Sequence, residues 1–173
     1  MRESVLAAVA HEAETPGERE FLDALSALAN SVVLVTCWAD GRPWGMTVTA
    51  FCSISADPPT VLVSLGAATT AARAIRRAGG FGVALLGHQQ EMLARYGSRP
   101  GAAKHLEEFL DPRAGSSTPV VADAVGHLDC EVIDTIVVAD HVLFVGRVRA
   151  VLATSGQTAP LVYHRRRFRR LGR

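Results

Sequence analysis

Two long β-rich runs in the C-terminal half of the chain constrain its fold more than any other feature. They cover residues 130–139 and 142–152, and only Asp140 and His141 separate them. Because a two-residue connection reverses a chain only as a tight turn, these runs predict a long antiparallel hairpin. No regular alternation of strands and helices accompanies them, which favours antiparallel β-structure over a parallel α/β sheet.

Shorter segments with strand or helix character lie around this hairpin. The strand-like segments cover 31–39, 46–55, 61–65, 81–86 and 120–121, with a final strand beginning at Leu161. Helical spacing or capping residues cover 18–30, 69–78, 88–96 and 102–109. Many short strands with inserted helices predict a mainly β fold, a closed antiparallel barrel with helical covers. With 173 residues, 49% of them hydrophobic, we expect one domain over 1–173, in which 1–17 is a flexible or helical N-terminal extension.

The segment 46–55 alternates between two kinds of side chain, as an extended strand with one packed face and one polar face does. The apolar face carries Met46, Val48, Ala50, Cys52 and Ile54, and the polar face carries Thr47, Thr49, Ser53 and Ser55. Pro58 and Pro59 end this strand, and 61–65 has the β-branched composition of a buried partner. On spacing alone, the polar face fits a ligand-binding sheet and an ordinary half-exposed strand equally well.

A helix start near Gly66 is a candidate phosphate site. Thr69 and Thr70 precede an alanine-rich helical sequence that contains Arg73 and ends before Gly79. The first turn of a helix presents unpaired backbone N–H groups and the positive end of the dipole, which favour an anion. By itself a threonine at this position is usually only a helix cap. The chain has neither G-x-G-x-x-G after a strand nor a P-loop, so any bound nucleotide needs another phosphate-binding device.

The segment that starts at Gly45 resembles the flavin reductase-like family, whose pattern is close to G-M-T-x-x-S-F-x-S-x-S-x-x-P-P-x-x-x-x-S. The matching residues are Gly45, Met46, Thr47, Phe51, Ser53, Ser55, Pro58, Pro59 and Ser64. Ala50 departs from the pattern, because the family usually has serine there. Three further pieces occur in the family's order, namely 81–86, Asp140-His141 before 146–148, and 160–163, so the resemblance spans about residues 20–171.

This resemblance implies an antiparallel, Greek-key-like split β-barrel of the kind that binds FMN. It further implies an NADH-dependent flavin oxidoreductase, in which hydride passes from NADH to flavin and the reduced flavin leaves for a separate monooxygenase. Members of the family are homodimers with sites near the interface. Of the two flavins we favour FAD over FMN, and by analogy we expect a role in natural-product biosynthesis.

Two other hypotheses are kept beside the reductase. The same barrel could serve as a non-catalytic module that binds flavin, a protein partner or nucleic acid. A relative of pyridoxamine phosphate oxidase would share the fold, but the pattern in 47–59 and the Asp140-His141 pair fit the reductase branch better.

The resemblance also assigns residues to the site. We expect the flavin ring against Met46, Thr47, Val48, Thr49 and Ala50, where N–H groups and hydroxyls can bond to the ring. The phosphate is expected at Ser64, Leu65, Gly66, Ala67, Thr69, Thr70 and Arg73. His141, with Asp140 beside it, is expected to position the nicotinamide, and Tyr163 to contact the cofactor. Lys104, the only lysine of the chain, is expected to contact phosphate or adenine from a lid.

The charge of the chain is unevenly distributed. The last thirteen residues hold six arginines and no acid, whereas the rest has 12 basic and 17 acidic residues. A basic tail with interleaved aromatics, such as 164–170, can bind nucleic acid. Because the segment starts with the apolar Leu161 and Val162, we favour a final strand whose arginines reach solvent or an anionic cofactor.

The cysteines and the apolar segments bear on the cellular location. Cys37, Cys52 and Cys130 are odd in number and widely spaced, which favours buried reduced thiols, with Cys52 as a small core residue. The N-terminal segment lacks the long apolar region of a signal peptide, and no apolar stretch approaches membrane-spanning length. We therefore expect a cytoplasmic protein.

Metal-dependent and hydrolytic chemistry find little support in the sequence. The pairs His105/Glu108 and His127/Asp129 lack the H-E-x-x-H spacing of a zinc site, so we predict no metal centre. The chain also lacks a G-x-S-x-G nucleophile motif.

Overall fold

The structure is a computed structural model that describes residues 17–111, 115–153 and 158–171. The predicted N-terminal extension therefore lies, apart from Gly17, outside the described residues. Within the described part, no helix is long and apolar enough to cross a membrane.

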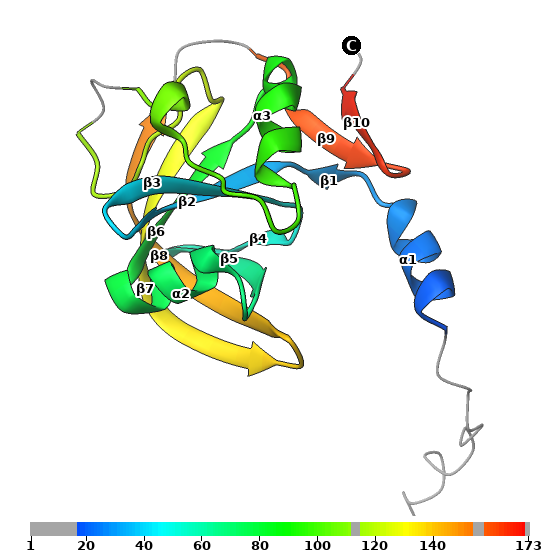
Figure 1. Cartoon of the computed structure of the whole chain (residues 1–173), viewed down its shortest axis with the longest axis horizontal. Coiled ribbons are helices and arrows are strands. Elements are labelled where there is room, and N and C mark those ends of the chain that lie inside the picture. The colour runs from blue at the N-terminus through cyan, green and yellow to red at the C-terminus, as the bar shows by residue number, and fades with distance from the viewer. Residues whose placement is uncertain (1–16, 112–114, 154–157, 172–173) are drawn as a thin grey trace, which may run out of the picture.

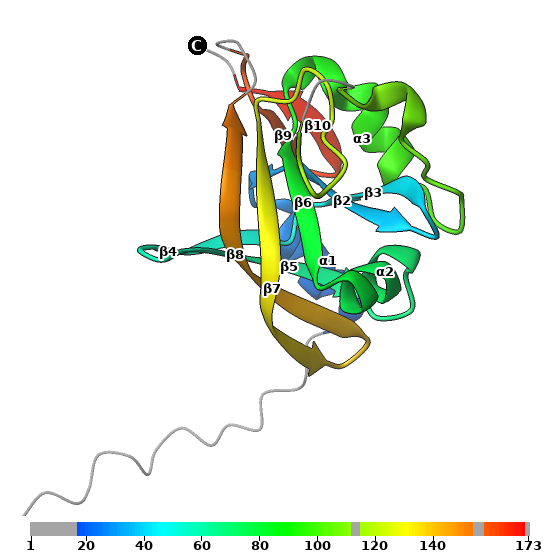
Figure 2. The ribbon, with the colours of Figure 1, turned by 90° about the vertical axis from the view of Figure 1, so that its left-hand side faces the viewer.

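Seven antiparallel strands form the main sheet, in the order β3-β2-β6-β7-β8-β5-β4. Their bounds are β2 Val33–Ala39, β3 Arg42–Val48, β4 Phe51–Ala56, β5 Pro59–Gly66, β6 Gly80–Leu85, β7 Gly126–Val138 and β8 His141–Ala153. In the views of Figures 1 and 2 these strands curl around a common centre instead of lying flat. The predicted mainly β, antiparallel fold is confirmed.

The chain connectivity requires this curl. The edge strands β3 and β4 are joined by only Thr49 and Ala50. In a flat seven-stranded sheet the two edges would lie roughly 29 Å apart, whereas three Cα steps span at most about 11 Å. The sheet therefore rolls until its edges meet at this loop, which is the geometry of a split barrel.

The long hairpin predicted from 130–152 is present and forms the longest pair of strands, drawn in yellow and orange in Figure 2. Its turn lies one residue earlier than predicted, at Ala139 and Asp140. Ala139 has a φ of 51°, and His141 is the first residue of β8, opposite Val138. Since Asp140 remains in the turn and His141 enters the ladder, the two residues have different surroundings.

A small second sheet has the strand order β1-β9-β10. Its strands are β1 Asn30–Ser31, β9 Leu161–His164 and β10 Arg167–Arg170. The predicted single final strand is therefore a hairpin. Arg165 and Arg166 form its turn with φ of 49° and 59°, which places β10 back against β9.

The helices are α1 Glu18–Ser26, α2 Thr70–Ala78 and α3 Glu91–Gly97, with short 3₁₀ turns η1 His88–Gln90 and η2 Glu107–Phe109. As predicted, Thr69 caps α2 by accepting a hydrogen bond from the Ala72 N–H, and Gly79 ends it with a φ of 71°. Two helices are shorter than predicted. α1 ends at Ser26 instead of Asn30, because Asn30 pairs with Tyr163 in the small sheet. The predicted helix 102–109 is reduced to η2, because residues 104–106 pair with β3 instead.

The core lies on both sides of β2, which is buried on both faces. Val33 and Val35 belong to a cluster with Phe81 and Phe144, whereas Leu34 belongs to a second cluster under α3 and β9. A strand covered on both faces reads as a continuous apolar run, as 32–35 does.

Cys52 is a correction to the sequence prediction. Its thiol is exposed instead of buried, and the neighbouring Ile54 on the same strand is 51% exposed. β4 is an edge strand that pairs only with β5, so its predicted packing face finds no cover within the described chain. The thiols of Cys37 and Cys130 are buried as predicted.

Candidate functional site

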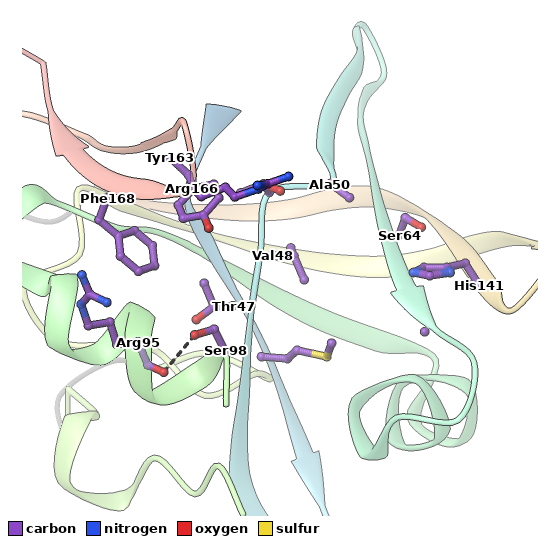
Figure 3. A pocket seen from close by; sticks show the side chains of 13 residues that line it. Thr47, Val48, Ala50, Ser64, Arg95, Ser98, His141, Tyr163, Arg166 and Phe168 are labelled. Atoms are coloured by element: carbon purple, nitrogen blue, oxygen red, sulfur yellow. Dashed lines mark hydrogen bonds between the residues drawn. The ribbon is translucent and has the colours of Figure 1, made fainter. Parts of the chain in front are cut away.

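A pocket of about 510 Å³ opens where β3 leaves the sheet. Its lining comes from four parts of the fold: β3 and the β3–β4 loop, β5 with the start of β8, α3, and the β9–β10 hairpin. The lining residues are Met46, Thr47, Val48, Thr49, Ala50, Ser64, Gly66, Arg95, Ser98, His141, Tyr163, Arg166 and Phe168. In Figure 3 His141 and Ser64 lie at one end, and Arg95 and Phe168 lie at the other.

The edge of β3 supplies polar groups along the middle of the pocket. The N–H of Gly45 points away from β2 and donates to the carbonyl of Lys104 at 3.0 Å. Because backbone groups alternate along a strand, the N–H of Thr47 also points away from β2. The Oγ1 of Thr47 is buried and has no hydrogen-bond partner. Thr47 therefore brings unused hydrogen-bonding capacity to the pocket.

The absence of a side chain at Gly97 makes this arrangement possible. A Cβ built on Gly97 would lie 2.4 Å from the Oγ1 of Thr47 and 3.1 Å from its backbone nitrogen. α3 can therefore pack against β3 at this point only because residue 97 is glycine. Beside Thr47, Met46 and Val48 are half-buried and pack on the barrel core, which gives the pocket an apolar floor.

The β3–β4 loop is held by backbone hydrogen bonds. Ser64 donates its N–H to the carbonyl of Ala50 at 3.0 Å, and Phe51 donates to the carbonyl of Thr49 at 3.0 Å. Thr49 and Ala50 are exposed. Their peptide groups are thus fixed in position and open to solvent, a requirement for a preorganised binding loop.

His141 reaches the pocket because it pairs with Gly66 across β8 and β5. Its Nδ1 lies 2.7 Å from the Oδ1 of Asp140, and half of its side chain is exposed. The hydrogen bond from His141, followed by the attraction of its charge, lowers the pKa of Asp140 below its usual value. The carboxylate therefore orients the imidazole ring, and Nε2 is left to contact a ligand.

Four further lining residues were not singled out individually from the sequence. Arg95 comes from α3 and Ser98 caps the C-terminus of that helix, whereas Arg166 and Phe168 come from the β9–β10 hairpin. The segment 164–170 carried a signal, since it contains five arginines with one phenylalanine among them. Sequence reasoning gave the arginines of this segment a choice between solvent and an anionic cofactor, and only the tertiary fold brings the segment to the same pocket as α3.

Several predicted site residues lie outside the pocket lining. Leu65 is buried in the core. Ala67 donates its backbone N–H to the carbonyl of Asp140 at 2.8 Å, and this bond joins the β5–α2 turn to the β7–β8 turn. Lys104 supplies its carbonyl to Gly45, and partial burial lowers the pKa of its amine. No structural observation shows Lys104 acting as a lid.

The side chains of the predicted phosphate site at α2 bond to one another and to the backbone. Thr69 donates its hydroxyl to the carbonyl of Gly66 at 2.8 Å, in addition to capping the helix. The guanidinium of Arg73 donates to the carbonyl of Ala68 at 2.5 Å and to the hydroxyl of Thr70 at 3.3 Å. Among these residues only Gly66 lines the pocket, so a phosphate at this helix stays a prediction.

The pair His127/Asp129 lies inside the barrel wall, away from the pocket. The Nε2 of His127 lies 3.0 Å from the hydroxyl of Thr118, and Asp129 accepts hydrogen bonds from Ser116 and Ser117. Over the described ranges, no three His, Cys, Asp or Glu side chains come together in a group that could hold a metal ion.

The fold and the pocket define a member of the flavin reductase-like family. The sequence model of the flavin reductase like domain matches residues 25–172, so the chain belongs to that family. The NADH-dependent FMN reductase AsuE2 of Streptomyces nodosus subsp. asukaensis is 38% identical over 154 residues, which cover 87% of this chain and 83% of the relative.

Two further relatives agree with this assignment. The reductase component of the 4-nitrophenol 4-monooxygenase/4-nitrocatechol 2-monooxygenase of Rhodococcus opacus is 36% identical over 149 residues, 86% of this chain and 78% of the relative. The structure of the NADH:FAD oxidoreductase SgcE6 of Streptomyces globisporus C-1027, in complex with NAD and FAD fragments, is similar with a TM-score of 0.81. It is 26% identical, and the match covers 91% of this chain and 95% of that one.

These comparisons confirm the family and the split-barrel fold that the pattern between Gly45 and Ser64 predicted. The predicted activity, NADH-dependent flavin reduction, is the activity after which these relatives are named. None of the three is named as a nucleic-acid-binding or non-catalytic module.

Proposed function

We propose that this protein is an NADH-dependent flavin reductase that supplies free reduced flavin to a separate monooxygenase. The single observation that carries the proposal is the pocket at the β3 edge, where an unpartnered Thr47 hydroxyl and an outward N–H meet an apolar floor. Relatives named as NADH-dependent reductases, one of them a monooxygenase component, support it. We favour FAD as the flavin and keep FMN as the second candidate.

The residues present fit a flavin. A volume of about 510 Å³ lies within the range of small-molecule sites. An isoalloxazine ring is flat and apolar on its faces and polar along one edge, which matches Met46 and Val48 below and the Thr47 groups beside them. When bound, flavin supplies a ring that accepts hydride at N5. The protein's part is to bind and orient the two reactants and to exclude water between them.

His141 is proposed to position the nicotinamide. Its Nδ1 is engaged with Asp140, so its ring orientation is fixed, and His141 lies at the end of the pocket away from Arg95. This role requires no change in the covalent state of the histidine. A phosphate subsite at Gly66 and the first turn of α2 is proposed as well, in which Thr70 and Arg73 exchange their mutual hydrogen bond for bonds to phosphate.

The experiment that tests the function is NADH oxidation followed by its absorbance, with FAD, with FMN and without flavin, and repeated with NADPH. We expect oxidation only when flavin is added, and faster with NADH than with NADPH. If flavin binds measurably but NADH is not oxidised, the reductase is disproved and only the non-catalytic flavin-binding module is left. Thr70→Ala and Arg73→Ala should each raise the apparent dissociation constant for flavin. If this constant is unchanged in both variants, the proposed phosphate subsite at α2 is wrong.

A homodimer is proposed from the apolar face of α1. Phe21, Leu22 and Leu25 on the helix and Leu28 just after it are between 42% and 54% exposed, and no residue of α1 is buried in the described chain. Leu22, Leu25 and Leu28 border a groove that shares Thr49, Ala50, Tyr163 and Arg166 with the pocket. Leu25→Asp should shift the mass measured by light scattering from dimer to monomer. Met92→Asp, at an exposed methionine of α3, is the matched control.

We also propose a cytoplasmic location. The reaction draws on NADH, and the three cysteines are all present as thiols. Fractionation of cells that produce the protein, with an antibody readout, tests this location.

A further inference from the structure

We propose that the outer face of the β9–β10 hairpin is a docking surface for an acidic region of the monooxygenase that takes up the reduced flavin. This basic face is formed by Arg165, Arg167 and Arg169, which are all exposed. The proposal rests on the function proposed above. It gives a role to the arginine-rich segment, most of which does not line the pocket.

The two faces of the β9–β10 hairpin carry different side chains. Tyr163 and Phe168 pair across the strands with their ring centroids 5.2 Å apart, and both line the pocket. Because side chains alternate along a strand, Arg167 and Arg169 point to the opposite face. Of the five arginines in the hairpin, only Arg166 belongs to the pocket lining. The arginines of the basic face therefore need a partner other than the cofactor.

The positive charge of the basic face is not neutralised within the described chain. Arg165, Arg167 and Arg169 form no ion pair with any residue that the structure describes. Asp23 of α1 does reach this hairpin, but it pairs with Arg166. Like charges held close together on one hairpin repel one another, and an acidic partner would offset this repulsion.

The basic face is held in a fixed position beside the pocket. Arg165 donates its backbone N–H to the carbonyl of Ser26 at 2.7 Å, and Arg166 pairs with Asp23, so the turn is fixed against α1. β10 is an edge strand of the small sheet and lies at the outside of the molecule in Figure 1. Arg165 is only one residue, about 3.8 Å, from the pocket-lining Arg166. A protein bound to the basic face therefore lies beside the flavin site.

An acidic protein surface fits the basic face better than a nucleic acid does. The rings of Tyr163 and Phe168 face the pocket, so this hairpin does not offer them on its basic face for stacking against bases. The formal net charge of the whole chain is only +1, whereas nucleic-acid-binding domains are strongly basic. Carboxylates pair with guanidinium groups through two parallel hydrogen bonds, which Asp and Glu side chains of a protein partner can supply.

Docking at this face would shorten the path of the reduced flavin. Free reduced flavin passes two electrons and two protons to dioxygen, which gives oxidised flavin and hydrogen peroxide, so time in solution loses reducing equivalents. Exposed charge pairs raise the rate of association more than they raise affinity. A partner held in this way arrives quickly and also leaves quickly, as repeated transfer of flavin requires.

The test is the binding of a fluorescently labelled polyglutamate peptide to the full chain without flavin, measured by anisotropy at low and at physiological salt. We expect binding at low salt that weakens as salt is added. Arg167→Glu and Arg169→Glu should each weaken binding by about fivefold, and the double variant should weaken it further. Neither residue lines the pocket, so NADH oxidation with added flavin should match that of the wild type.

Arg99→Glu is the matched control. Arg99 is also exposed, does not line the pocket, and undergoes the same change of charge in this variant. Its peptide affinity should stay within about twofold of the wild type, because the effect of an exposed charge fades over about one Debye length. A single-stranded DNA oligonucleotide with the same net charge as the peptide is the second probe, and its binding should vanish at physiological salt.

Three results would overturn the docking surface. Equal peptide affinity in the wild type and the double variant, or no binding in either, would remove the arginines from binding. Tight oligonucleotide binding at physiological salt that is lost in the double variant would identify a nucleic-acid site. A shift from dimer to monomer in the double variant, measured by light scattering, would show that a second copy of the chain covers this face.

The peptide titration needs neither flavin nor NADH, so it is independent of the proposed activity. If the peptide binds through the arginines but the protein oxidises no NADH, the acidic docking surface stands, whereas the reductase and its monooxygenase partner are disproved. If NADH is oxidised but no peptide binds, the reductase stands and the docking surface is wrong.

Discussion

Two histidine–aspartate pairs occur in this protein, and their surroundings give them opposite roles. His127 and Asp129 lie two residues apart on β7, inside the barrel wall. His141 and Asp140 are adjacent at the β7–β8 turn, on the rim of the pocket. The same two residue types are thus a structural element in one place and a candidate ligand contact in the other.

The buried pair is enclosed by polar neighbours. Asp129 accepts from the hydroxyls of Ser116 and Ser117, and His127 contacts Thr118. Burial lowers the pKa of His127 to about 4, against an opposing effect of Asp129. For Asp129 burial raises the pKa, but hydrogen bonds from the two serines and the charge of His127 more than offset it, so the pKa is lowered. Such a cluster adds stability only while its charge state is kept.

The exposed pair has spare capacity instead. His141 uses only Nδ1 for Asp140, and both side chains are at least half exposed. Exposed ion pairs contribute little to stability, so selection for folding does not explain this one. Each imidazole has one ring nitrogen without a partner, so the comparison teaches that exposure separates the two roles: the Nδ1 of His127 is closed off in the barrel wall, whereas half of the His141 side chain is open to a ligand.

The largest effect is expected from adding one carbon beside the buried pair. In Gly82→Ala the new Cβ would lie 2.3 Å from the Oγ1 of Thr36 and 2.5 Å from the Cε1 of His127. Neither atom belongs to a flexible side-chain end, so the variant should lose roughly 3 kcal/mol of unfolding free energy in urea titrations. Gly126→Ala, where the nearest atom is at 3.6 Å, is the control and should lose less than about 1 kcal/mol. If Gly82→Ala loses as little unfolding free energy as Gly126→Ala, the cluster around His127 tolerates the added carbon and the prediction is wrong.

The next effect separates the two histidines by pH. The folded-state pKa of His127 lies below its ordinary value of 6.5, so the unfolded chain takes up the proton first as the pH falls. Its stabilising contribution is complete above about pH 6.5 and declines toward pH 4. Unfolding free energies should therefore drop by about 2 kcal/mol between pH 7.5 and pH 5. Asp129 acts in the same direction, but only below about its ordinary pKa, outside this window.

Variants assign that pH dependence to one residue. His127→Gln should reduce the drop, even if the variant is less stable at every pH. His141→Gln should keep it. A drop of equal size in His127→Gln and the wild type would contradict the assignment.

A smaller effect is expected at the exposed pair, and it should appear in activity. His141→Ala should lower kcat/KM for NADH by about tenfold, which corresponds to about 1.4 kcal/mol, and should change flavin affinity much less. The measurement combines steady-state oxidation at varied NADH with flavin titration. Equal losses of NADH use and flavin binding would argue against a nicotinamide contact.

The smallest effect concerns Thr47, whose hydroxyl is buried and unpartnered. In Thr47→Val flavin affinity should fall about threefold, while unfolding free energy should stay equal or rise slightly, because no protein hydrogen bond is lost. Thr36→Val is the control, since the Thr36 hydroxyl donates to the carbonyl of Pro119 at 2.7 Å and should cost about 1 kcal/mol of stability. A loss of stability in Thr47→Val without a change in affinity would remove Thr47 from the site.

Local patterns predicted much of the fold. The hairpin of β7 and β8, the capped helix α2 and the strand after Pro59 all follow from signals a few residues apart. The pattern from Gly45 to Ser64 predicted the family, and 46–50, Ser64, Gly66, His141 and Tyr163 do meet in one pocket. Alternation could not tell that Cys52 would be exposed, because that depends on which strand covers β4.

By itself, then, the sequence determined the periodicities, the turns and the resemblance to a flavin-binding family, since these depend on neighbours along the chain. The tertiary structure decided which polar groups have partners. It enclosed His127 inside the wall with only Nε2 bonded, left Thr47 and His141 with unused capacity, and brought Arg95 of α3 and Arg166 of a distant hairpin to the lining of one pocket. Hydrogen bonding and burial are properties of contacts between segments far apart in sequence, so no local pattern could have assigned them.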